Sequence, residues 1–600
     1  MPPAPTELEA FRDWFAEHFS LYDKPYTLDL DQARAVLDGH KNTLVTARAG
    51  SGKTRVIVAK IAYLLATGQA TQAEIVAFMF NRTAAQEVNE RIAEVKFDGR
   101  PIIKHVSTEQ TSTSGQHSVK IASTFHKFAL DIVKLSGARP ELISGTEHEG
   151  LIRHGLDRAL KSQEPERHVS KRDFDELLKT ISGFVARAGQ KYIGQTDLAE
   201  LQKSIEDYAS RHLGDSNFAE KVRLHQLGSA AFKNYLTNLR SPKTDFNLLM
   251  SRAADLLHGY ASGTATTEFS CDRASAASRI LRKVRPLKFI MIDEYQDFSQ
   301  LFLNLVLSLR ENCPSAHLFA VGDDWQAINR FAGSDVDYFI HFADYFPEDV
   351  INIPLMTNYR SCRRIVENAN DYMLKNYDPT ASRAVPFNHK PGKIIRRNPD
   401  KTRFNADDIR EDALGDARYQ IALARAIIAD KQPSNKTLVS SQTKSTTPST
   451  DHIKSAANIS ADAAKLLKTV FKILRKNRHS EIMLLHRHNF TTFSDITLEA
   501  FHAALKILAV EEGIMAPENF DQQVHCLTMH KSKGLESEVV ILLEANRDLV
   551  LGRHPNADLW QLFGDSSATE KSDQHRLLYV AMTRAKQKLY ILSTDKKFAL

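Results

Sequence analysis

A glycine-rich turn near the start of the chain places the strongest constraint on its fold. It reads Ala-Arg-Ala-Gly-Ser-Gly-Lys-Thr over residues 47–54 and follows a short apolar, β-branched run at residues 42–45. That run predicts a buried strand, and residues 56–62 continue as a helix. A strand, a turn closed by Gly-Lys-Thr and a helix are typical of a phosphate-binding loop, whose backbone N–H groups and helix N-terminus hold the anion. Ala47 stands where glycine is usual, and the alternative is a chance glycine-rich turn.

The side chains of this turn indicate the chemistry of its ligand. Lys53 is placed to neutralise phosphate charge, and the Thr54 hydroxyl is placed to ligate magnesium. Upstream, Gln32 opens a helix, and its amide offers the donor and the acceptor needed to read an adenine base, although most surface glutamines have no such role. The loop residues expected at the nucleotide are Ala49, Gly50, Ser51, Gly52, Lys53, Thr54 and Arg55.

Composition limits the class of protein. The length of 600 residues corresponds to about four domain-sized units, and 42% hydrophobic with 25% charged residues is ordinary for a globular protein. The sequence shows neither an apolar run near the ~20 residues of a membrane helix nor a signal-peptide core. The net charge of +6 permits binding to a polyanion without demonstrating it. Cys271, Cys313, Cys362 and Cys526 lack CxxC spacing, which argues against disulfides or zinc and for a reducing cytosol.

Strands and helices alternate along the first part of the chain. Residues 75–80 predict a second buried strand that runs into a helix at residues 83–92. Such alternation implies a parallel sheet, and ligands of parallel sheets gather at the carboxyl ends of the strands, where Lys53 and Phe80 fall. Residues 105–119 predict an exposed loop. The pattern from about 147 to 284 is mostly helical, for example at residues 171–188, 197–211 and 246–257, and predicts an inserted helical subdomain.

An acidic pair follows the strand at which the alternation resumes. Residues 287–292 are apolar and lead directly into Asp293 and Glu294. Asp293 can hold magnesium through water, and Glu294 can orient and deprotonate an attacking water. The alternative is a solvated acidic pair on a loop, but its position after an apolar strand, together with a phosphate loop, favours catalysis. The next strand, at residues 316–321, delivers Gly-Asp-Asp-Trp-Gln-Ala-Ile.

The second half of the chain predicts a second sheet. This sheet is expected to start near residues 351–355, just before Asn-Tyr-Arg-Ser. Residues 433–452, rich in Ser and Thr, are expected to form a mobile loop. A helix at residues 461–476 leads to a strand at residues 481–485.

Taken in order, the motifs of this chain resemble those of UvrD/Rep-type helicases of superfamily 1. They read AGSGKT, STFH, DEYQD, GDDWQAI, NYRS, HKSKGLE and YVAMTRA, and the GDDWQAI and DEYQDFS forms look closest to the helicase IV branch. The resemblance implies an α/β fold of two RecA-like P-loop motor domains. It also implies ATP in the cleft between these domains and single-stranded DNA across their tops.

The resemblance assigns residues to the site for ATP and Mg²⁺. Lys53 and Thr54 match the phosphate and magnesium ligands, and Asp293 matches the second magnesium contact. Gln32 resembles the adenine-reading glutamine, Tyr359 the ring that stacks on the base, and Glu536 the ribose contact. The residues implied in catalysis are Lys53, Asp293, Glu294 as general base, Gln326 as γ-phosphate sensor, and Arg360 and Arg584 as arginine fingers. Fingers from the opposite domain make hydrolysis depend on closure of the cleft.

The resemblance also implies contacts to single-stranded DNA. The residues at these positions are Phe80, Thr124, Phe125, His126, Phe331, Thr528 and His530. Stacking on aromatic rings tolerates any base sequence, as a translocase requires. The alternative for Phe80, Phe125 and Phe331 is that they are core residues. Relatives often read Tyr-x-Trp-Arg where this chain has Asn329, Phe331 and Ala332, so one stacking ring and one positive charge are missing.

The motifs divide the chain into predicted domains. The ranges are residues 1–95 and 285–345 for the first motor domain, 96–284 for the inserted helical subdomain with its strand-contacting motif at 122–128, 346–489 and 524–600 for the second motor domain, and 490–523 for a short helical insertion. In UvrD and Rep a large helical subdomain occupies this last place. A stretch this short cannot build an independent core, so that subdomain is predicted to be absent or reduced to a hairpin.

The function implied by the resemblance is a DNA-dependent ATPase that moves 3′→5′ on single-stranded DNA and unwinds duplexes. Single-stranded DNA and single/double-strand junctions are the expected partners, in the cytoplasm at the nucleoid, with a role such as DNA repair. One alternative is a translocase that displaces proteins or drives a partner complex without unwinding. Another is a nucleotide switch that binds no nucleic acid, which the strand-facing and arginine-finger motifs disfavour. A fused nuclease is not expected, because little chain follows Arg584.

Overall fold

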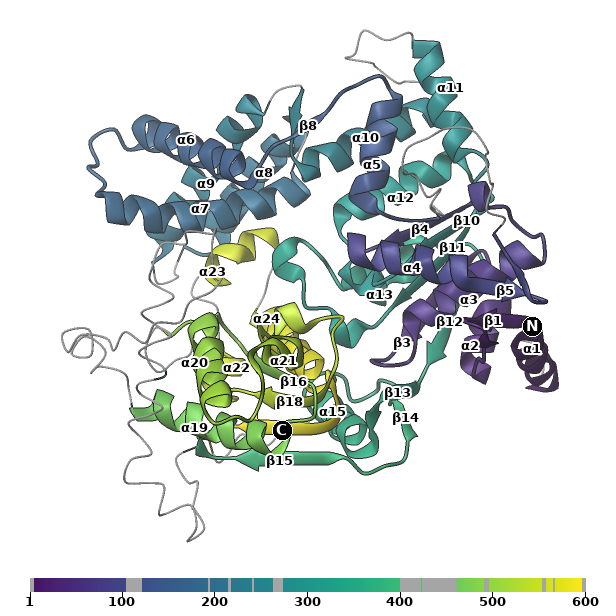
Figure 1. Cartoon of the computed structure of the whole chain (residues 1–600). Coiled ribbons are helices and arrows are strands. Elements are labelled where there is room, and N and C mark those ends of the chain that lie inside the picture. The colour runs from purple at the N-terminus through teal and green to yellow at the C-terminus, as the bar shows by residue number, and fades with distance from the viewer. Residues whose placement is uncertain are drawn as a thin grey trace, which may run out of the picture. The chain divides into compact units, whose positions relative to one another are not determined.

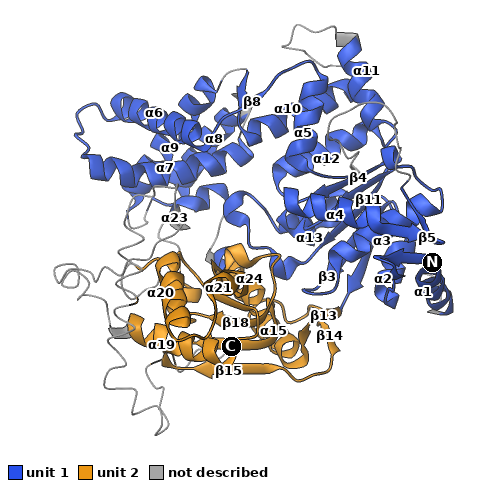
Figure 2. Ribbon diagram, viewed as in Figure 1, with its two compact units in different colours: residues 1–356, 553–570 blue, residues 357–552, 571–600 orange. Residues whose placement is uncertain are grey.

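Parallel β-sheets form the centre of each of two units in the computed structural model of the chain (Figure 1). One unit comprises residues 1–356 and 553–570, and the other comprises residues 357–552 and 571–600 (Figure 2). The structure describes residues 5–103, 121–192, 195–213, 217–239, 242–262, 273–399, 422, 461–489, 496–552, 557–564 and 567–595. The loops predicted at residues 105–119 and 433–452 lie outside these ranges. Among the described residues, no helix combines the length and the apolar character needed to cross a membrane.

The first unit contains a six-stranded parallel sheet in the order β12-β3-β11-β10-β4-β7. Its strands are β3 (Asn42–Ala47), β4 (Ile75–Met79), β7 (Ala122–Thr124), β10 (Phe289–Ile292), β11 (His317–Gly322) and β12 (Val350–Leu355). Apolar runs without polar alternation are expected for strands covered on both faces, and every residue of β4 is buried. The parallel α/β fold predicted for this part of the chain is confirmed.

Two strands lie elsewhere than the sequence predicted. β12 was expected to open the second sheet, but it pairs with β3 from Val350 opposite Asn42 to Leu355 opposite Ala47, as an edge strand of the first sheet. The edge position accommodates Pro354, which has no N–H group to donate to a further strand. β7 falls within the range predicted as the helical insertion, yet it pairs with β4 in the same sheet.

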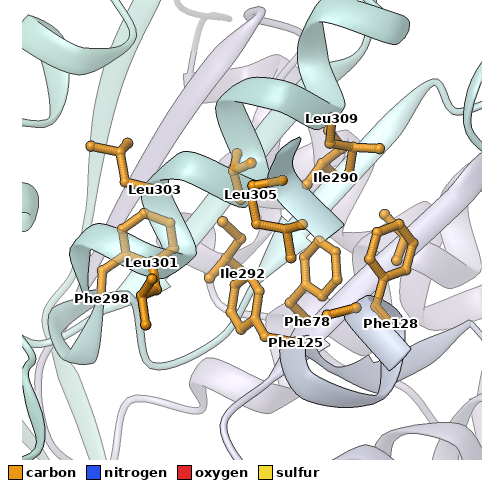
Figure 3. Packing of buried hydrophobic residues seen from close by; sticks show 14 of the residues in the cluster. Phe78, Phe125, Phe128, Ile290, Ile292, Phe298, Leu301, Leu303, Leu305 and Leu309 are labelled. Carbon is orange, nitrogen blue, oxygen red and sulfur yellow. The ribbon is translucent and has the colours of Figure 1, made fainter. Parts of the chain in front are cut away.

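Helices cover both faces of this sheet. Alternate residues of β4 point to opposite sides: Val76 and Phe78 belong to one apolar cluster, and Ala77 and Met79 belong to the other. The Phe78 side is covered by α5 (Phe125–Leu135), α10 (Phe246–Ser262), α11 (Arg273–Val284) and α12 (Gln300–Asn312), part of which Figure 3 shows. The other side is covered by α1 (Pro5–His18), α2 (Leu30–Leu37), α3 (Lys53–Ala66) and α4 (Arg82–Glu94).

Short elements complete the described part of this unit. The strands β1 (Phe19–Leu21), β2 (Lys24–Pro25), β5 (Val95–Phe97) and β6 (Arg100–Pro101) form a small antiparallel sheet, and β8 (Glu141–Leu142) pairs with β9 (Lys243–Thr244). The short helices are η1 (Gln72–Glu74), η2 (Tyr295–Asp297), η3 (Asp324–Gln326), η4 (Arg330–Ala332), α13 (Asp337–Ile340) and α14 (Phe342–Tyr345).

A separate helical core lies within the first unit. It is formed by α6 (Gly145–Gln163), α7 (Lys171–Lys191), α8 (Gln195–Arg211) and α9 (Phe218–Asn238) around buried side chains that include Phe184 and Phe232. Each of α6 and α7 begins at a serine whose side chain accepts a hydrogen bond from a backbone N–H of the first turn. The helices expected at residues 171–188, 197–211 and 246–257 are all present.

A distant segment of the sequence also packs into this helical core. α23 (Ala557–Trp560) and η7 (Gln561–Phe563) follow the central strands of the second sheet in the sequence, but they belong to the first unit. The His225 ring nitrogen Nε2 lies 3.0 Å from the carbonyl oxygen of Leu559. A Cβ atom at Gly183 would lie 2.8 Å from the Trp560 ring, so only glycine lets the indole approach α7 this closely.

The second unit is built on a five-stranded parallel sheet in the order β15-β19-β18-β16-β17. Its strands are β15 (Lys393–Arg397), β16 (Ile482–His486), β17 (Val524–Thr528), β18 (Ser537–Leu542) and β19 (Ala585–Leu592), and β13 (Thr357–Cys362) pairs separately with β14 (Val385–Asn388). Its helices are α15 (Arg363–Asn376), α19 (Ala461–Lys476), α20 (Leu498–Glu511), α21 (Pro517–Gln523), η6 (His530–Ser532), α22 (Arg547–Val550) and α24 (Ser567–Met582), whose first residues belong to the first unit.

The interval between β16 and β17 holds α20 and α21 in its described part. The second of these helices, residues 517–523, begins at Pro517. Proline suits a first helical position because its fixed φ is already helical and no hydrogen bond is lost. Residues 400–421 and 423–460, which also bear on the predicted loss of a large subdomain, lie outside the described residues.

Candidate nucleotide-binding and strand-binding residues

The glycine-rich turn connects β3 to α3, as the sequence predicted. Gly50 has φ 73° and Gly52 has φ 85°, in the left-handed region that glycine adopts without strain. A Cβ atom at Gly52 would lie 3.1 Å from the Gln32 side-chain nitrogen, so the turn also needs a residue without a side chain. The first backbone N–H groups of α3 have no partner within the helix, which leaves them available to an anion.

Gln32 is held against this turn. Its Nε2 donates to the Ser51 carbonyl oxygen at 3.0 Å, and its Oε1 accepts from the Asp29 backbone N–H at 3.2 Å. The Asp29 carboxylate in turn accepts from the Gln32 backbone N–H at 2.7 Å, which completes a capping box at the start of α2. Gln32 is 2% exposed, so it is an integral part of the loop rather than a surface glutamine.

Arg55 secures the same region on its outer side. Its Nε donates to the Thr27 carbonyl oxygen at 3.2 Å, and its guanidinium carbon lies 4.6 Å from the centre of the Tyr26 ring. The Tyr26 hydroxyl donates to the Arg55 carbonyl oxygen at 2.8 Å. These contacts tie the segment before α2 to the first turn of α3.

The acidic pair lies beside the phosphate loop. Asp293 and Glu294 directly follow β10, the neighbour of β11 in the sheet. Glu294 has φ 52°, in the left-handed region, and its Oε2 lies 3.3 Å from Lys53 Nζ. The side-chain amide of Gln296 donates to the same carboxylate oxygen. The structure therefore brings together Lys53 and Glu294, and it adds Gln296, which sequence reasoning missed.

The groups around the turn fit a magnesium–nucleotide ligand. Ser51 is 1% exposed, and its hydroxyl oxygen is a buried polar atom without a hydrogen-bond partner among the described residues. Such an atom is costly to bury unless a ligand or water satisfies it. Thr54 is the second residue of α3, and Asp293 directly precedes Glu294, whose carboxylate contacts Lys53 of the turn. Oxygen ligands of this kind are those that Mg²⁺ prefers.

Gln326 lies in the short helix η3, immediately after β11. Its Nε2 donates to Asp323 Oδ2 at 2.6 Å, and the side chain is buried. Asp323 also pairs with Arg48, a buried arginine of the phosphate loop that sequence reasoning missed. In the sequence, Arg48 could have been noticed as a charged residue, besides Lys53, in a turn of small residues. Its partners could have been noticed as the Asp-Asp pair in GDDWQAI.

In the second unit, Tyr359 is exposed enough to receive a base. It is 39% exposed, and its ring centre lies 4.8 Å from that of Phe387, which is 62% exposed. The two residues lie on the paired strands β13 and β14 and form a continuous aromatic surface. Phe387 is a further candidate for base contact. In the sequence, only an aromatic residue downstream of the NYRS motif could have pointed to it.

Arg360 and Glu536 bind each other within the second unit. Arg360 Nε lies 2.6 Å from Glu536 Oε2, and Lys586 Nζ lies 2.8 Å from Glu536 Oε1. Burial raises the pKa of Glu536, but hydrogen bonds and charge from Lys586 and Arg360 outweigh burial and hold that pKa below its usual value. The implied arginine finger and the implied ribose contact are thus side by side.

Arg584 donates hydrogen bonds to backbone carbonyl groups of the second unit. It is 1% exposed, its Nε donates to the Val580 carbonyl oxygen at 2.9 Å, and one terminal nitrogen donates to the Leu535 carbonyl oxygen at 3.1 Å. A finger role therefore requires the guanidinium to leave these carbonyl groups. The sequence alone did not reveal this, because a buried arginine and an exposed one read alike in a motif.

The implied strand-contacting aromatic residues differ in exposure. Phe80 is 45% exposed and Phe331 is 58% exposed, so both rings can stack on bases. Phe125 is 4% exposed, and its ring is stacked on that of Phe78, with the ring centres 4.3 Å apart (Figure 3). Its ring is also stacked on that of Phe302, again with 4.3 Å between centres. The expectation that Phe125 faces a DNA strand is corrected: its ring belongs to the core, because α5 buries its apolar face against the sheet.

The polar residues of the predicted strand contacts are largely buried. Thr124 caps α5, accepting a hydrogen bond from the Lys127 backbone N–H at 3.2 Å. Burial lowers the pKa of the half-buried His126, whose ring centre lies 4.9 Å from that of Phe246. In the second unit, Thr528 ends β17, and burial with the nearby Arg487 and His488 lowers the pKa of His530 to about 4. His530 is therefore neutral at pH 7.

Comparison with known proteins agrees with this arrangement. Residues 28–347 match the UvrD/REP helicase N-terminal domain, and residues 493–596 match the UvrD-like helicase C-terminal domain. DNA helicase IV of Escherichia coli (strain K12) is 30% identical over 375 residues, which are 61% of this chain and 50% of that protein. ATP-dependent DNA helicase PcrA of Bacillus subtilis (strain 168) is 26% identical over 349 residues, 58% of this chain and 39% of that protein.

The chain spans about half the length of the curated relatives it matches, or less. The N-terminal match alone covers more than half of the chain and includes the phosphate loop, the acidic pair and the Gln326 segment. The chain belongs to the UvrD/REP helicase family.

Proposed function

We propose that this protein is an ATP-dependent helicase that moves 3′→5′ along single-stranded DNA and unwinds duplex DNA at single/double-strand junctions. The observation that carries the proposal is the 3.3 Å contact between Lys53 Nζ in the phosphate loop and Glu294 Oε2 after β10. A cation for the phosphates and a base for water stand together at the carboxyl edge of a parallel sheet, where ligands bind in such folds. The names of the relatives support the choice of DNA.

The residues of the first unit have distinct roles in this proposal. Lys53 neutralises charge on the phosphates, and Glu294 accepts the proton of the attacking water. Thr54 and Asp293 are the residues that would hold Mg²⁺, which when bound neutralises charge on the phosphate oxygens. Gln326 contacts the γ-phosphate through its amide.

In this proposal, residues of the second unit make ATP hydrolysis depend on movement of Arg360 to the phosphates. Tyr359 stacks on the adenine base, and Arg360 stabilises charge on the transferred phosphoryl group. An arginine finger is worth roughly 10³–10⁵ in rate, so hydrolysis depends on bringing Arg360 to the phosphates. Before that, the ion pair between Arg360 and Glu536 has to open or turn.

The short interval between β16 and β17 favours a second candidate, a translocase that displaces proteins from single strands without unwinding duplex alone. Its described part holds α20 and α21, with no large helical domain that could hold duplex DNA. Within the helicase proposal, the same feature predicts a monomer that does not inhibit itself.

Tailed duplexes separate these candidates. The purified chain, with ATP and Mg²⁺, is given a duplex with a 3′ tail, the same duplex with a 5′ tail, and a single strand carrying streptavidin on its end. Unwinding of the 3′-tailed duplex alone supports the helicase. Streptavidin displacement without unwinding supports the translocase, and an ATPase rate unaffected by single strands at low salt contradicts both.

A further inference from the structure

A buried arginine connects the phosphate loop to the segment that carries Gln326. Arg48 is 3% exposed, and one of its terminal nitrogens lies 2.8 Å from Asp323 Oδ1 and 2.6 Å from Asp324 Oδ1. Its guanidinium carbon lies 3.9 Å from the centre of the Trp325 ring, which is fully buried. One cation therefore holds three consecutive residues that follow β11.

From Asp323 the contacts continue to the groups proposed for hydrolysis. Its second carboxylate oxygen accepts from Gln326 Nε2 at 2.6 Å, and its backbone N–H donates to Gln296 Oε1 at 2.8 Å. Gln296 in turn donates from its amide nitrogen to Glu294. Glu294 pairs with Lys53, so the contacts begin in the phosphate loop at Arg48 and return to it at Lys53.

The geometry gives Arg48 a specific influence on this series of contacts. Asp323 is fully buried and Asp324 is partly buried, and buried carboxylates are stable only when a partner compensates their charge. Without Arg48, the buried Asp323 carboxylate has to rotate toward water or admit water to replace the lost partner. Each of these changes withdraws or weakens the carboxylate oxygen that fixes the Gln326 amide.

We propose that Arg48 is a positioning residue for ATP hydrolysis, which sets Asp323 and through it the side chains of Gln326 and Glu294. This inference rests on the proposed function, in which Gln326 contacts the γ-phosphate and Glu294 is the base. Arg48 itself is occupied by two carboxylates and an indole ring, so it acts through Asp323 and not as a phosphate ligand.

The same series of contacts should affect how strongly single-stranded DNA stimulates ATP hydrolysis. The residues fixed by Arg48 lead within a few positions to η4, which carries the exposed Phe331. From the other side, Gln190 of α7 donates to the Ala332 carbonyl oxygen at 2.7 Å. Loss of Arg48 frees the start of this segment, so stimulation by single strands is expected to fall together with the hydrolysis rate.

The test compares Arg48→Ala, Arg48→Gln and Arg48→Lys in the full chain, with and without oligo(dT). Steady-state ATPase kinetics give kcat and KM, and a fluorescent ATP analogue gives the nucleotide Kd. We expect Arg48→Ala and Arg48→Gln to lower the DNA-stimulated kcat about 10- to 100-fold, below the 10²–10³ that a direct transition-state donor contributes. Nucleotide Kd should change less than about 3-fold, because phosphate ligands remain in place. Arg48→Lys keeps the charge but loses the planar guanidinium that stacks on Trp325, so it should recover only part of the activity.

A double mutant shows whether Arg48 acts through Gln326. Residues that act as one unit give non-additive losses, so Arg48→Ala combined with Gln326→Ala should lose less activity than the sum of the two single losses. Arg223→Ala is the matched control, because Arg223 forms an ion pair with Glu164 at 2.5 Å in the helical core, away from these residues. It should leave kcat unchanged. If Arg48→Ala fails to fold, the DNA-stimulated kcat values of Arg48→Gln and Arg48→Lys are compared instead.

Three results overturn the inference: an unchanged kcat in Arg48→Ala and Arg48→Gln, fully additive losses with Gln326→Ala, or a raised nucleotide Kd with kcat unchanged. These results are distinguishable from failure of the proposed function itself. In that case the unmodified protein shows no ATPase activity, or Glu294→Gln and Gln326→Ala are as active as the unmodified protein.

Discussion

Arg360 and Glu536 form an ion pair with 2.6 Å between Nε and Oε2, although 176 positions separate them in the sequence. Arg360 lies on β13, and Glu536 directly precedes β18. In the proposed function Arg360 contacts phosphate, and the family resemblance implies that Glu536 contacts ribose. On this proposal, the ion pair holds both side chains in place before ATP binds, and Arg360 has to leave Glu536 to reach the phosphates.

Arg360→Ala tests this pairing together with the finger role. We expect kcat for DNA-stimulated hydrolysis to fall by roughly 10³–10⁵, with a much smaller effect on nucleotide Kd. Arg360→Lys should recover little, because lysine lacks the planar fork of donors. Arg363→Ala is a suitable control, since Arg363 begins α15 and pairs with Glu367 on the same helix. A kcat in Arg360→Ala equal to that of the control rules out a finger at this position.

Phe331 and Phe125 should respond differently to truncation, because one ring is exposed and the other lies in the core. Phe331→Ala should weaken binding of oligo(dT) by about 1–3 kcal/mol, the usual worth of one stacked base, and leave stability unchanged. Phe125→Ala should destabilise the fold by about 3–5 kcal/mol through the cavity it leaves. Fluorescence anisotropy measures the first effect and urea unfolding the second. Equal loss of DNA affinity in both variants, at unchanged stability, contradicts the assignment of Phe125 to the core.

Trp560 should anchor residues 557–564 on the helical core of the first unit. Trp560→Ala removes a ring that packs against Gly183 and lies under the guanidinium group of Arg187, with 4.9 Å from that group's carbon to the ring centre. We expect a loss of about 3–5 kcal/mol in the unfolding transition of this core, and faster hydrogen exchange in α23. Leu213→Ala is the control, because Leu213 is 72% exposed and its loss should change stability by less than about 0.5 kcal/mol.

His225 should make the same contact sensitive to acid. Burial, with smaller contributions from Lys221 and His212, lowers the pKa of His225 to about 4, against the hydrogen bond to Leu559 that raises it. His225 binds a proton near pH 6.5 in the unfolded chain and near pH 4 in the folded chain. The free energy of unfolding therefore falls as the pH drops between these values. The full effect is about 3 kcal/mol. The free energy of unfolding, measured with urea, should fall less between pH 7.5 and 4.5 for His225→Gln than for the unmodified protein. If the two proteins lose the same free energy of unfolding over this pH range, this account is contradicted.

The local motifs were predictable because each is set by neighbours in the sequence. The phosphate loop between β3 and α3, the acidic pair after β10 and the helix at residues 461–476 follow from apolar runs, glycine positions and helical periodicity. The first sheet was predicted except for its two edge strands, β12 and β7. β12 was misplaced because a short run next to a motif of the second unit carries no mark of which sheet it joins.

Long-range packing was not predictable from the pattern alone. Trp560 lies in the helical core of the first unit, more than 300 positions after the helices it contacts, and no local pattern encodes that distance. Phe125 and Phe80 are both aromatic residues near strand ends, yet only the helix face of Phe125 turns it inward. Arg48 and Arg584 are buried by partners that only the fold brings together.

The most direct test of the central claim is the single-turnover hydrolysis rate of Glu294→Gln with saturating oligo(dT), ATP and Mg²⁺. This change keeps the shape of the side chain and removes the base. The account predicts that the variant binds ATP and oligo(dT) with affinities close to those of the unmodified protein and hydrolyses ATP at least ~10²-fold more slowly. Retention of most of the DNA-stimulated rate contradicts the assignment of Glu294 as the base, and with it the proposed site.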